Sequence, residues 1–215
     1  DLMMLEMIAN CNWTRPIYVA LTVGAENYMN LGDNFIQEGL ANRISPFTTN
    51  APGAKNFDSE KTYNNLMNRY KYGGLSTKGL YIDETVMRMC YTHRRLFGQL
   101  ALNLIAEHKD DKALKVLQKA EKEIPDYNVP YNYISGGLDF ARAYALLGQK
   151  KRANEILNKV WNHSAQYAQW YLGLAQSRFT QSQRDCMMHL SIMNQASELY
   201  GLIDKKQADE KAKTL

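Results

Sequence analysis

Two stretches of this 215-residue chain, forty positions apart, repeat one spacing of small and large apolar residues. In each copy, apolar residues follow one another at intervals of three or four positions: Ala113, Leu117 and Ala120, then Ala153, Leu157 and Val160. Residues at this spacing share one face of an α-helix. Small residues on such a face let a neighbouring helix approach closely, and the larger ones fill the space between the two. The repeat therefore predicts helices that pack side by side in successive pairs.

The helical pattern is continuous from Asp83, which is a good N-cap residue, to about residue 203. The first helix carries one long apolar stripe: Val86, Cys90, His93, Phe97, Leu100, Ala101, Leu104 and Ile105. Pro125 ends the second helix, and Gly148 separates a third from a fourth. Further helical segments are expected at 165–176 and 183–203. The highly charged tail at 204–215 is expected to fray.

This arrangement resembles tetratricopeptide repeats, whose basic period is 34 residues. Pro125 stands where that repeat usually has a proline, and the segment DYNVPYNYI at 126–134 accounts for the six additional residues. A degenerate third copy near 199–208 would meet the rough minimum of three units. The copies also depart from the repeat: Phe97 and Gly137 stand at the usual tryptophan position, and His108 replaces the turn glycine that is present as Gly148. A generic helical bundle is the alternative.

The first 82 residues have a different character. A short helix is expected at 2–10, and the run CNWTRPIYVALTV predicts a strand over 16–23 that is buried on both faces. Its partner is either the segment 40–48 or a strand outside this chain. A loop at 48–60 and a helix at 60–72, ended by two glycines, follow.

The predicted fold is therefore mainly α: a tetratricopeptide-like array of helix pairs (an α–α superhelix) at 83–203. A small α/β lead-in with one or two short strands precedes it at 1–82, and the charged tail occupies 204–215. The start at Asp1, already helical in pattern, indicates a piece cut from a longer protein.

Composition and motifs exclude several classes of function. The formal charge of +4 is too small and too well mixed for a nucleic-acid partner. Three widely spaced cysteines form no disulfide framework, and four scattered histidines lack the spacing of metal ligands. Nucleophile elbows and phosphate loops are absent. The sequence therefore predicts no catalytic residue, no cofactor and no metal, and this chain is not expected to be an enzyme by itself.

The best candidates for binding are aromatic. Tyr127, Tyr131 and Tyr133 lie close together in the segment that separates the two repeats, and tyrosine combines contact area with a polar tip. With Arg142 and Trp170 they are candidate contacts for an extended polypeptide. Alternatively, the tyrosine rings wedge between helix pairs and hold their angle. A third interpretation is carbohydrate binding, with exposed Trp161 and Trp170 stacking on sugar rings.

The N-terminal region carries a family resemblance. The motif Trp13-x-Arg15-Pro16-Ile17-Tyr18 is followed by Glu38-Gly39-Leu40 with Arg43 and Pro46, by YNNLMNRY at 63–70 and by VPYNY at 129–133. Together these resemble the C-terminal soluble region of a Bacteroidetes family of polytopic membrane proteins similar to protein O-mannosyltransferases. The resemblance covers roughly residues 1–200.

This resemblance implies that the transmembrane helices and the catalytic acids lie in an N-terminal portion outside this chain. The chain would then be soluble and face the periplasm. Trp13, Arg15, Pro16, Glu38 and Gly39 would help to fix the junction with the membrane portion. The expected function is a non-catalytic accessory domain that binds a protein partner or an acceptor polypeptide. A carbohydrate-binding domain and a purely structural domain of the parent protein are the alternatives.

Overall fold

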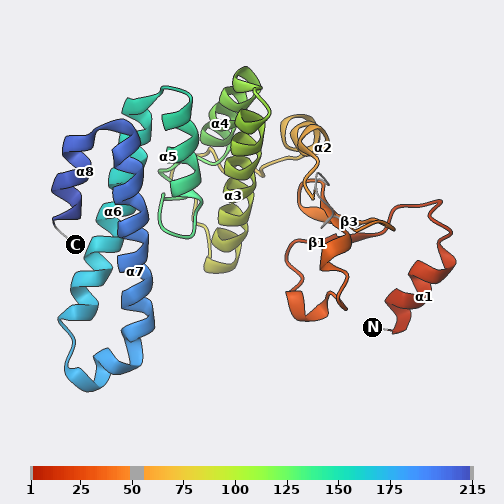
Figure 1. Cartoon of the computed structure of the whole chain (residues 1–215), viewed down its shortest axis with the longest axis horizontal. Coiled ribbons are helices and arrows are strands. Elements are labelled where there is room, and N and C mark those ends of the chain that lie inside the picture. The colour runs from red at the N-terminus through yellow and green to blue at the C-terminus, as the bar shows by residue number, and fades with distance from the viewer. Residues whose placement is uncertain (1, 49–55, 214–215) are drawn as a thin grey trace. The chain divides into compact units, whose positions relative to one another are not determined.

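The computed structural model describes residues 2–48 and 56–213 (Figure 1). The chain divides into two compact units between Lys71 and Tyr72. Residues 72–82, which were assigned to the lead-in, belong to the second unit.

The N-terminal unit contains a small antiparallel sheet. Its helices and strands are α1 (Leu2–Asn10), β1 (Tyr18–Ala20), β2 (Phe35–Gln37), β3 (Ala41–Ile44) and α2 (Ser59–Asn64), with two short 3₁₀ turns at Ala25–Asn27 and Gly32–Asn34. The central strand is β3, which pairs with β1 on one side and with β2 on the other. The partner of the predicted strand therefore lies within this chain, in the segment 40–48.

The lead-in differs from its prediction in three ways. It has three strands rather than one or two, because the three-residue β2 is too short to show alternation. β1 is not buried on both faces: it is an edge strand whose Tyr18 and Ala20 are exposed, and the apolar Leu21 lies beyond its end. The helix predicted at 60–72 begins at Ser59, capped by Asp58, and ends in a π-helical turn at Asn65–Arg69.

The second unit consists of helices that pack in consecutive pairs. These are α3 (Glu84–Ala106) with α4 (Asp110–Glu123), α5 (Gly137–Leu146) with α6 (Lys150–Leu172), and α7 (Gln176–Ile203) with α8 (Lys205–Ala212). The first helix of each pair also packs against the first helix of the next, as the succession of ribbons in Figure 1 shows. The prediction of a mainly α chain built from helix pairs is confirmed.

The repeated alanines lie in the contacts between helices. Ala113, Ala120 and Ala153 are buried, and so are the larger Leu117 and Leu157. A second close approach joins α3 to α5 at Gly98, where an added Cβ would lie 3.0 Å from the Cβ of Asp139. The small residues therefore set the distance between the helices, as the repeat predicted.

Three details of the helical prediction are wrong. The fourth helix continues into most of the segment at 165–176 as one helix, α6, which ends at Leu172, because nothing between them caps or breaks it. The charged tail does not fray at Asp204, whose side chain accepts the backbone N–H of Lys206 and caps α8. In α3, burial of the stripe begins at Cys90, so Val86 in the first turn is 45% exposed.

Candidate functional site

The segment between α4 and α5 is folded onto α3 by a buried arginine. Arg94 is 1% exposed, and its guanidinium donates to the carbonyl oxygens of Ile124 (2.8 Å), Val129 (2.5 Å) and Pro130 (3.2 Å). It also lies 4.4 Å from the centre of the Tyr131 ring. Burial lowers the pKa of Arg94 and raises that of Tyr131. Arg94 therefore ties the part of the inter-repeat segment up to Tyr131 to α3.

The three candidate tyrosines of this segment occupy different surroundings. Tyr127 is exposed, and its hydroxyl donates to the carbonyl of Ser76. Tyr131 is buried against Arg94, whereas Tyr133 packs against the imidazoles of α6 and α7. The structure does not bring the three rings to one surface. The alternative in which rings wedge between helices describes Tyr131 and Tyr133.

Tyr133 belongs to a larger set of rings, here called the distal aromatic cluster: Tyr133, His163, Tyr167, Tyr171 and His189. Tyr167 stacks on His189 with 4.9 Å between ring centres and 9° between planes. Tyr133 approaches His189 edge-on, also at 4.9 Å. The cluster joins α6 to α7 through aromatic faces.

The imidazoles of the distal aromatic cluster are shielded from solvent, which favours their neutral form. His189 is 2% exposed, and the Nδ1 atoms of His163 and His189 are buried with no hydrogen-bond partner among the described residues. Burial lowers the pKa of both imidazoles, and at His189 the neighbouring His163 lowers it further. The sequence argued against metal binding by the histidines and placed His93 on the apolar stripe of α3, but it did not predict this cluster. His163, Tyr167 and Tyr171 follow one another at intervals of four residues in α6, and this spacing was the signal in the sequence for a shared aromatic face.

Trp170 lies at the solvent side of this cluster. It is 59% exposed and, with Gln166 and the 45% exposed Tyr167, lines a hollow of about 330 Å³. Tyr171 contacts the indole edge-on at 4.9 Å. Trp161, which was expected to be exposed as well, is only 3% exposed and packs against Tyr200. It lies nine residues earlier in α6, within the part of the helix that α7 and α8 cover.

Arg142, the remaining candidate contact, belongs to a second surface. It is exposed on α5, and exposed Arg95 lies on the adjacent α3. Asp139 between these helices is half-buried: burial raises the pKa of this carboxyl group, and the charges of Arg142 and Arg95 act in the opposite direction. Gly136 allows this approach, because an added Cβ there would lie 3.0 Å from the Cα of Arg95. Arg95, Asp139 and Arg142 are called the arginine face below.

The junction candidates in the N-terminal unit divide into exposed and buried residues. Trp13, Arg15 and Pro16 are exposed ahead of β1. Glu38 is 5% exposed, and Gly39, with a φ of 106°, is buried beside it. The motif therefore combines a surface segment with a buried turn.

Glu38 is the centre of a polar cluster. Its carboxylate accepts from the Tyr18 hydroxyl (2.8 Å), from Arg43 Nε (2.6 Å) and from Lys61 Nζ (2.8 Å). Burial alone would raise the pKa of Glu38. The hydrogen bonds from Arg43, Lys61 and Tyr18 outweigh it and hold the pKa below its usual value. Through Glu38 the cluster connects Tyr18 of β1, Arg43 of β3 and Lys61 of α2, so its role is structural.

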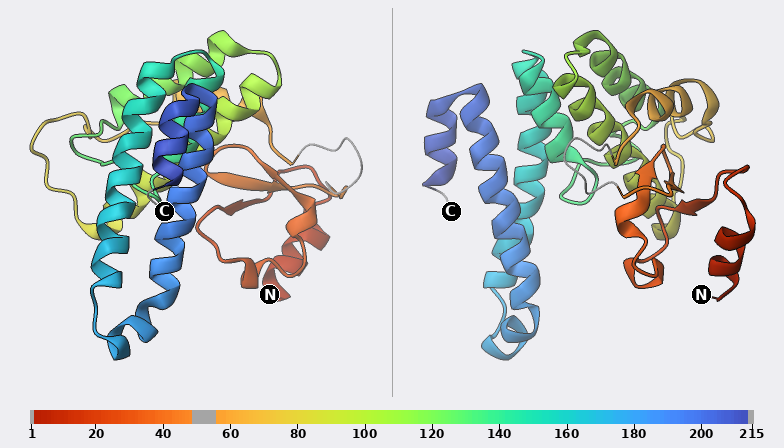
Figure 2. Two further views of the ribbon diagram at one scale, coloured as in Figure 1. Left: turned by 60° about the vertical axis from the view of Figure 1, so that its left-hand side comes forward. Right: turned by 45° about the vertical axis from the view of Figure 1, so that its right-hand side comes forward.

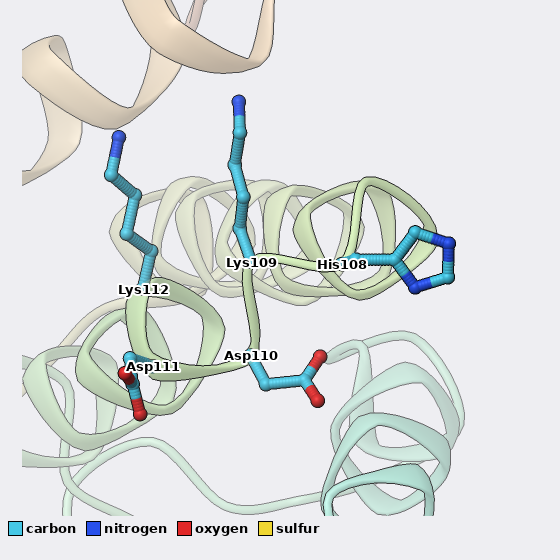
Figure 3. Close-up of a pocket in the computed structure, with 5 residues that line it drawn as sticks. All are labelled: His108, Lys109, Asp110, Asp111 and Lys112. Atoms are coloured by element: carbon cyan, nitrogen blue, oxygen red, sulfur yellow. The ribbon is translucent and has the colours of Figure 1, made fainter.

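The turn between α3 and α4 contains another hollow, of about 390 Å³ (Figure 3). Its lining residues are consecutive: His108, Lys109, Asp110, Asp111 and Lys112. Figure 3 shows the two lysines pointing one way and the imidazole and carboxylates pointing elsewhere. These groups do not converge on a common point, so the geometry supports no chemistry there.

Two features are absent from the described part of the chain. Within residues 2–48 and 56–213, no group of three or more His, Cys, Asp or Glu side chains is placed to hold a metal ion. None of the helices described here is both long and apolar enough to cross a bilayer.

Residues 1–63 match the family model described as TMEM260-associated domain 2. No curated protein and no solved structure matches the chain. The match lies entirely within the N-terminal unit, and it includes Glu38 and the motif around Trp13.

Proposed function

We propose that this chain is a non-catalytic accessory region of a membrane protein similar to protein O-mannosyltransferases. In this proposal it is soluble, faces the periplasm and follows the membrane portion of its parent. The similarity of residues 1–63 to a TMEM260-associated domain supports a parent with such a membrane part. The same residues carry the motif that resembles the Bacteroidetes family, so two observations point to one region.

The helical unit binds a polypeptide, either a protein partner or an acceptor of the parent enzyme. The observation that carries this proposal is the arginine face, where exposed Arg95 and Arg142 flank the half-buried Asp139 across two adjacent helices. Guanidinium groups bind carboxylates in a bidentate manner. Stacked helix pairs of the tetratricopeptide type commonly bind extended segments. The partner is therefore an extended segment that contains acidic residues.

A dodecapeptide display library selected on the full 215-residue chain tests this proposal. We expect the selected peptides to be enriched in Asp and Glu. Arg142→Ala should weaken their binding about tenfold, because a charged hydrogen bond is lost. Arg88→Ala, which removes an exposed arginine elsewhere on α3, is the matched control. Peptides without acidic enrichment, or binding that survives Arg95→Ala with Arg142→Ala, would contradict the assignment.

The accessory role is tested in the parent protein. Arg142→Glu should lower the glycosylation of envelope proteins while the parent remains at its normal level in the membrane. Unchanged glycosylation would contradict an accessory role of the arginine face.

Carbohydrate binding is the second candidate, favoured by the exposed rings of Tyr167 and Trp170 beside Gln166. Aromatic faces and an amide are groups that contact sugars. Binding on a glycan array that is lost with Trp170→Ala would establish it, and an array without signal would eliminate it.

A further inference from the structure

The α6–α7 hairpin extends well past its neighbours. α6 has 23 residues and α7 has 28, whereas the flanking α5 and α8 have 10 and 8. At 1.5 Å per residue, more than half of α6 therefore lies beyond the length that α5 covers. Both views of Figure 2 show the turn between α6 and α7 at the far end of the helical unit, away from α8. This far end is called the hairpin tip.

The hairpin tip is rich in exposed apolar side chains. Trp170 is 59% exposed, Leu172 is 61% exposed and Tyr167 is 45% exposed, all within the last six residues of α6. Leu174 in the turn and Phe179 in the first part of α7 are half-buried. In a water-soluble protein, such a concentration at one protruding end marks an interaction surface.

The charge of this region is mainly basic. Between Ile156 and Arg184 the sequence contains no Asp or Glu, and its only charged residues are Lys159, Arg178 and Arg184. Asp185, which follows Arg184, lies near Tyr171 and His189 of the distal aromatic cluster. Arg178 lies in the first turn of α7, and Arg184 lies about 9 Å further along that helix. Lys159 pairs with Asp126 away from the tip. A surface that is apolar at its end and basic just behind it complements an anionic lipid layer.

We propose that the hairpin tip binds the surface of an anionic bilayer, with Trp170 and Leu172 entering the headgroup region and Arg178 and Arg184 contacting lipid phosphates. Tryptophan and tyrosine favour this interface because their rings are apolar and their tips are polar. Apolar side chains on peripheral helices enter it by about 5–10 Å. That depth matches the distance from the turn to Tyr167, which lies five residues before the end of α6.

The bilayer fits these residues better than a sugar does. A sugar site needs several hydrogen-bonding groups in a ring around the aromatic face, and the hollow beside Trp170 offers the side chain of Gln166 and no carboxylate. The exposed Leu172, two positions after Trp170, contributes nothing to sugar recognition but does contribute to insertion into lipid. The proposal is independent of peptide binding at the arginine face, which lies on α3 and α5.

The distal aromatic cluster keeps the tip in position. Stacking of Tyr167 on His189 and the edge contact of Tyr133 fasten α6 to α7 in the part that α5 and α8 leave uncovered. The tip is therefore presented by a braced pair of helices rather than by a loose loop.

Cosedimentation and tryptophan fluorescence with vesicles test the proposal. The full chain carrying Trp13→Phe retains buried Trp161 and exposed Trp170 as its emitters. Vesicles of phosphatidylglycerol and phosphatidylcholine should shift the emission of this protein to the blue and bind it, whereas pure phosphatidylcholine should do so weakly. Arg178→Gln with Arg184→Gln should lower the partition coefficient roughly 25-fold, since two basic charges are removed.

Apolar variants complete the test. Trp170→Ala should weaken binding on the order of tenfold, and Leu172→Gln should act in the same direction. Leu202→Gln, which changes a leucine that is 52% exposed near the other end of α7, is the matched control and should bind vesicles like the parent. An absence of binding, equal binding by all variants, or a blue shift caused by glycans or by self-association without vesicles would overturn the proposal.

Discussion

The sheet of the N-terminal unit is organised around a buried charge, whereas the helical unit is organised around buried alanines. Glu38 receives three side-chain donors from β1, β3 and α2, so the small sheet depends on hydrogen bonds of fixed geometry. The helices depend on how closely their faces approach at Ala113 and Ala153. Loss of a polar partner should therefore destabilise the sheet, while loss or gain of side-chain volume in the core should destabilise the helical unit.

The largest expected effect tests the apolar side of this comparison. Trp161→Ala should lower the free energy of unfolding of the helical unit by about 3–5 kcal/mol, since it leaves a cavity beneath Tyr200. Trp170→Ala in the same helix is the control and should change it by less than about 0.5 kcal/mol, because that ring is exposed. Denaturation followed by circular dichroism measures both. Equal effects would mean that the two rings share one environment.

Substitution of Arg94 tests whether the stability of the helical unit depends on side-chain packing alone. Arg94→Ala should destabilise it by about 3 kcal/mol, because the carbonyls of Ile124, Val129 and Pro130 lose a charged donor. Arg95→Ala, one residue later and exposed, should have little effect on the same denaturation curve. Amide exchange across 126–134 should rise with the first change only. If Arg94→Ala is as stable as the parent, buried polar contacts contribute little to the stability of the helical unit.

The polar side is tested at the sheet. Glu38→Gln keeps the shape of the side chain but removes the charge that binds Arg43 and Lys61. We expect a loss of about 2 kcal/mol, limited because Lys61 is half exposed to solvent. Faster amide exchange at Ala41–Ile44 measures it. Glu26→Gln, an exposed substitution in the same unit, should leave that exchange unchanged.

A smaller effect is expected at the turn beside Glu38. Gly39 has a φ of 106°, and a Cβ there would lie 2.5 Å from the hydroxyl oxygen of Tyr70. Gly73→Ala is strained in its backbone, with a φ of 59°, but meets no neighbouring atom. Gly39→Ala should therefore cost about 1 kcal/mol more than Gly73→Ala. If Tyr70→Phe restores none of this difference, the clash is not its cause.

The smallest effect concerns pH. The pKa of Glu38 is lower in the folded chain, so its contribution to stability is fully present above its unfolded pKa of about 4.3. That contribution is lost as the pH falls through the lower folded value. The protection factors of the β3 amides should therefore fall more steeply below pH 4 in the parent than in Glu38→Gln. Parallel curves would show that Glu38 is not the group responsible.

The agreement between sequence and structure differs between the two units for a physical reason. The helices could be predicted because an apolar stripe such as that of α3 is repeated over many turns, and Asp83 marks its beginning. β1 and β2 are only three residues long, so their pattern is too short to separate a buried strand from an edge strand. The neighbour that a strand pairs with decides which of its faces is covered.

The candidate residues show the same limit. Trp161 and Trp170 are nine positions apart in one helix, and no local pattern indicates that one is 3% exposed and the other 59%. Only one residue separates Tyr131 from Tyr133, yet each packs against a different set of helices. Their surroundings depend on the length of α5 and on the position of Arg94, neither of which is local to them.

The helical class of this protein and the small-residue contacts between its helices could be read from the amino-acid sequence. The sequence also showed that the strand near Pro16 needs a partner, either in the segment after Gly39 or in a strand elsewhere. These follow from periodicity and backbone chemistry, which act over a few residues. Only the tertiary structure decided which strand partner was right and which aromatic rings are covered. Coverage depends on where other helices end, and a short α5 beside a long α6 leaves Trp170 in solvent.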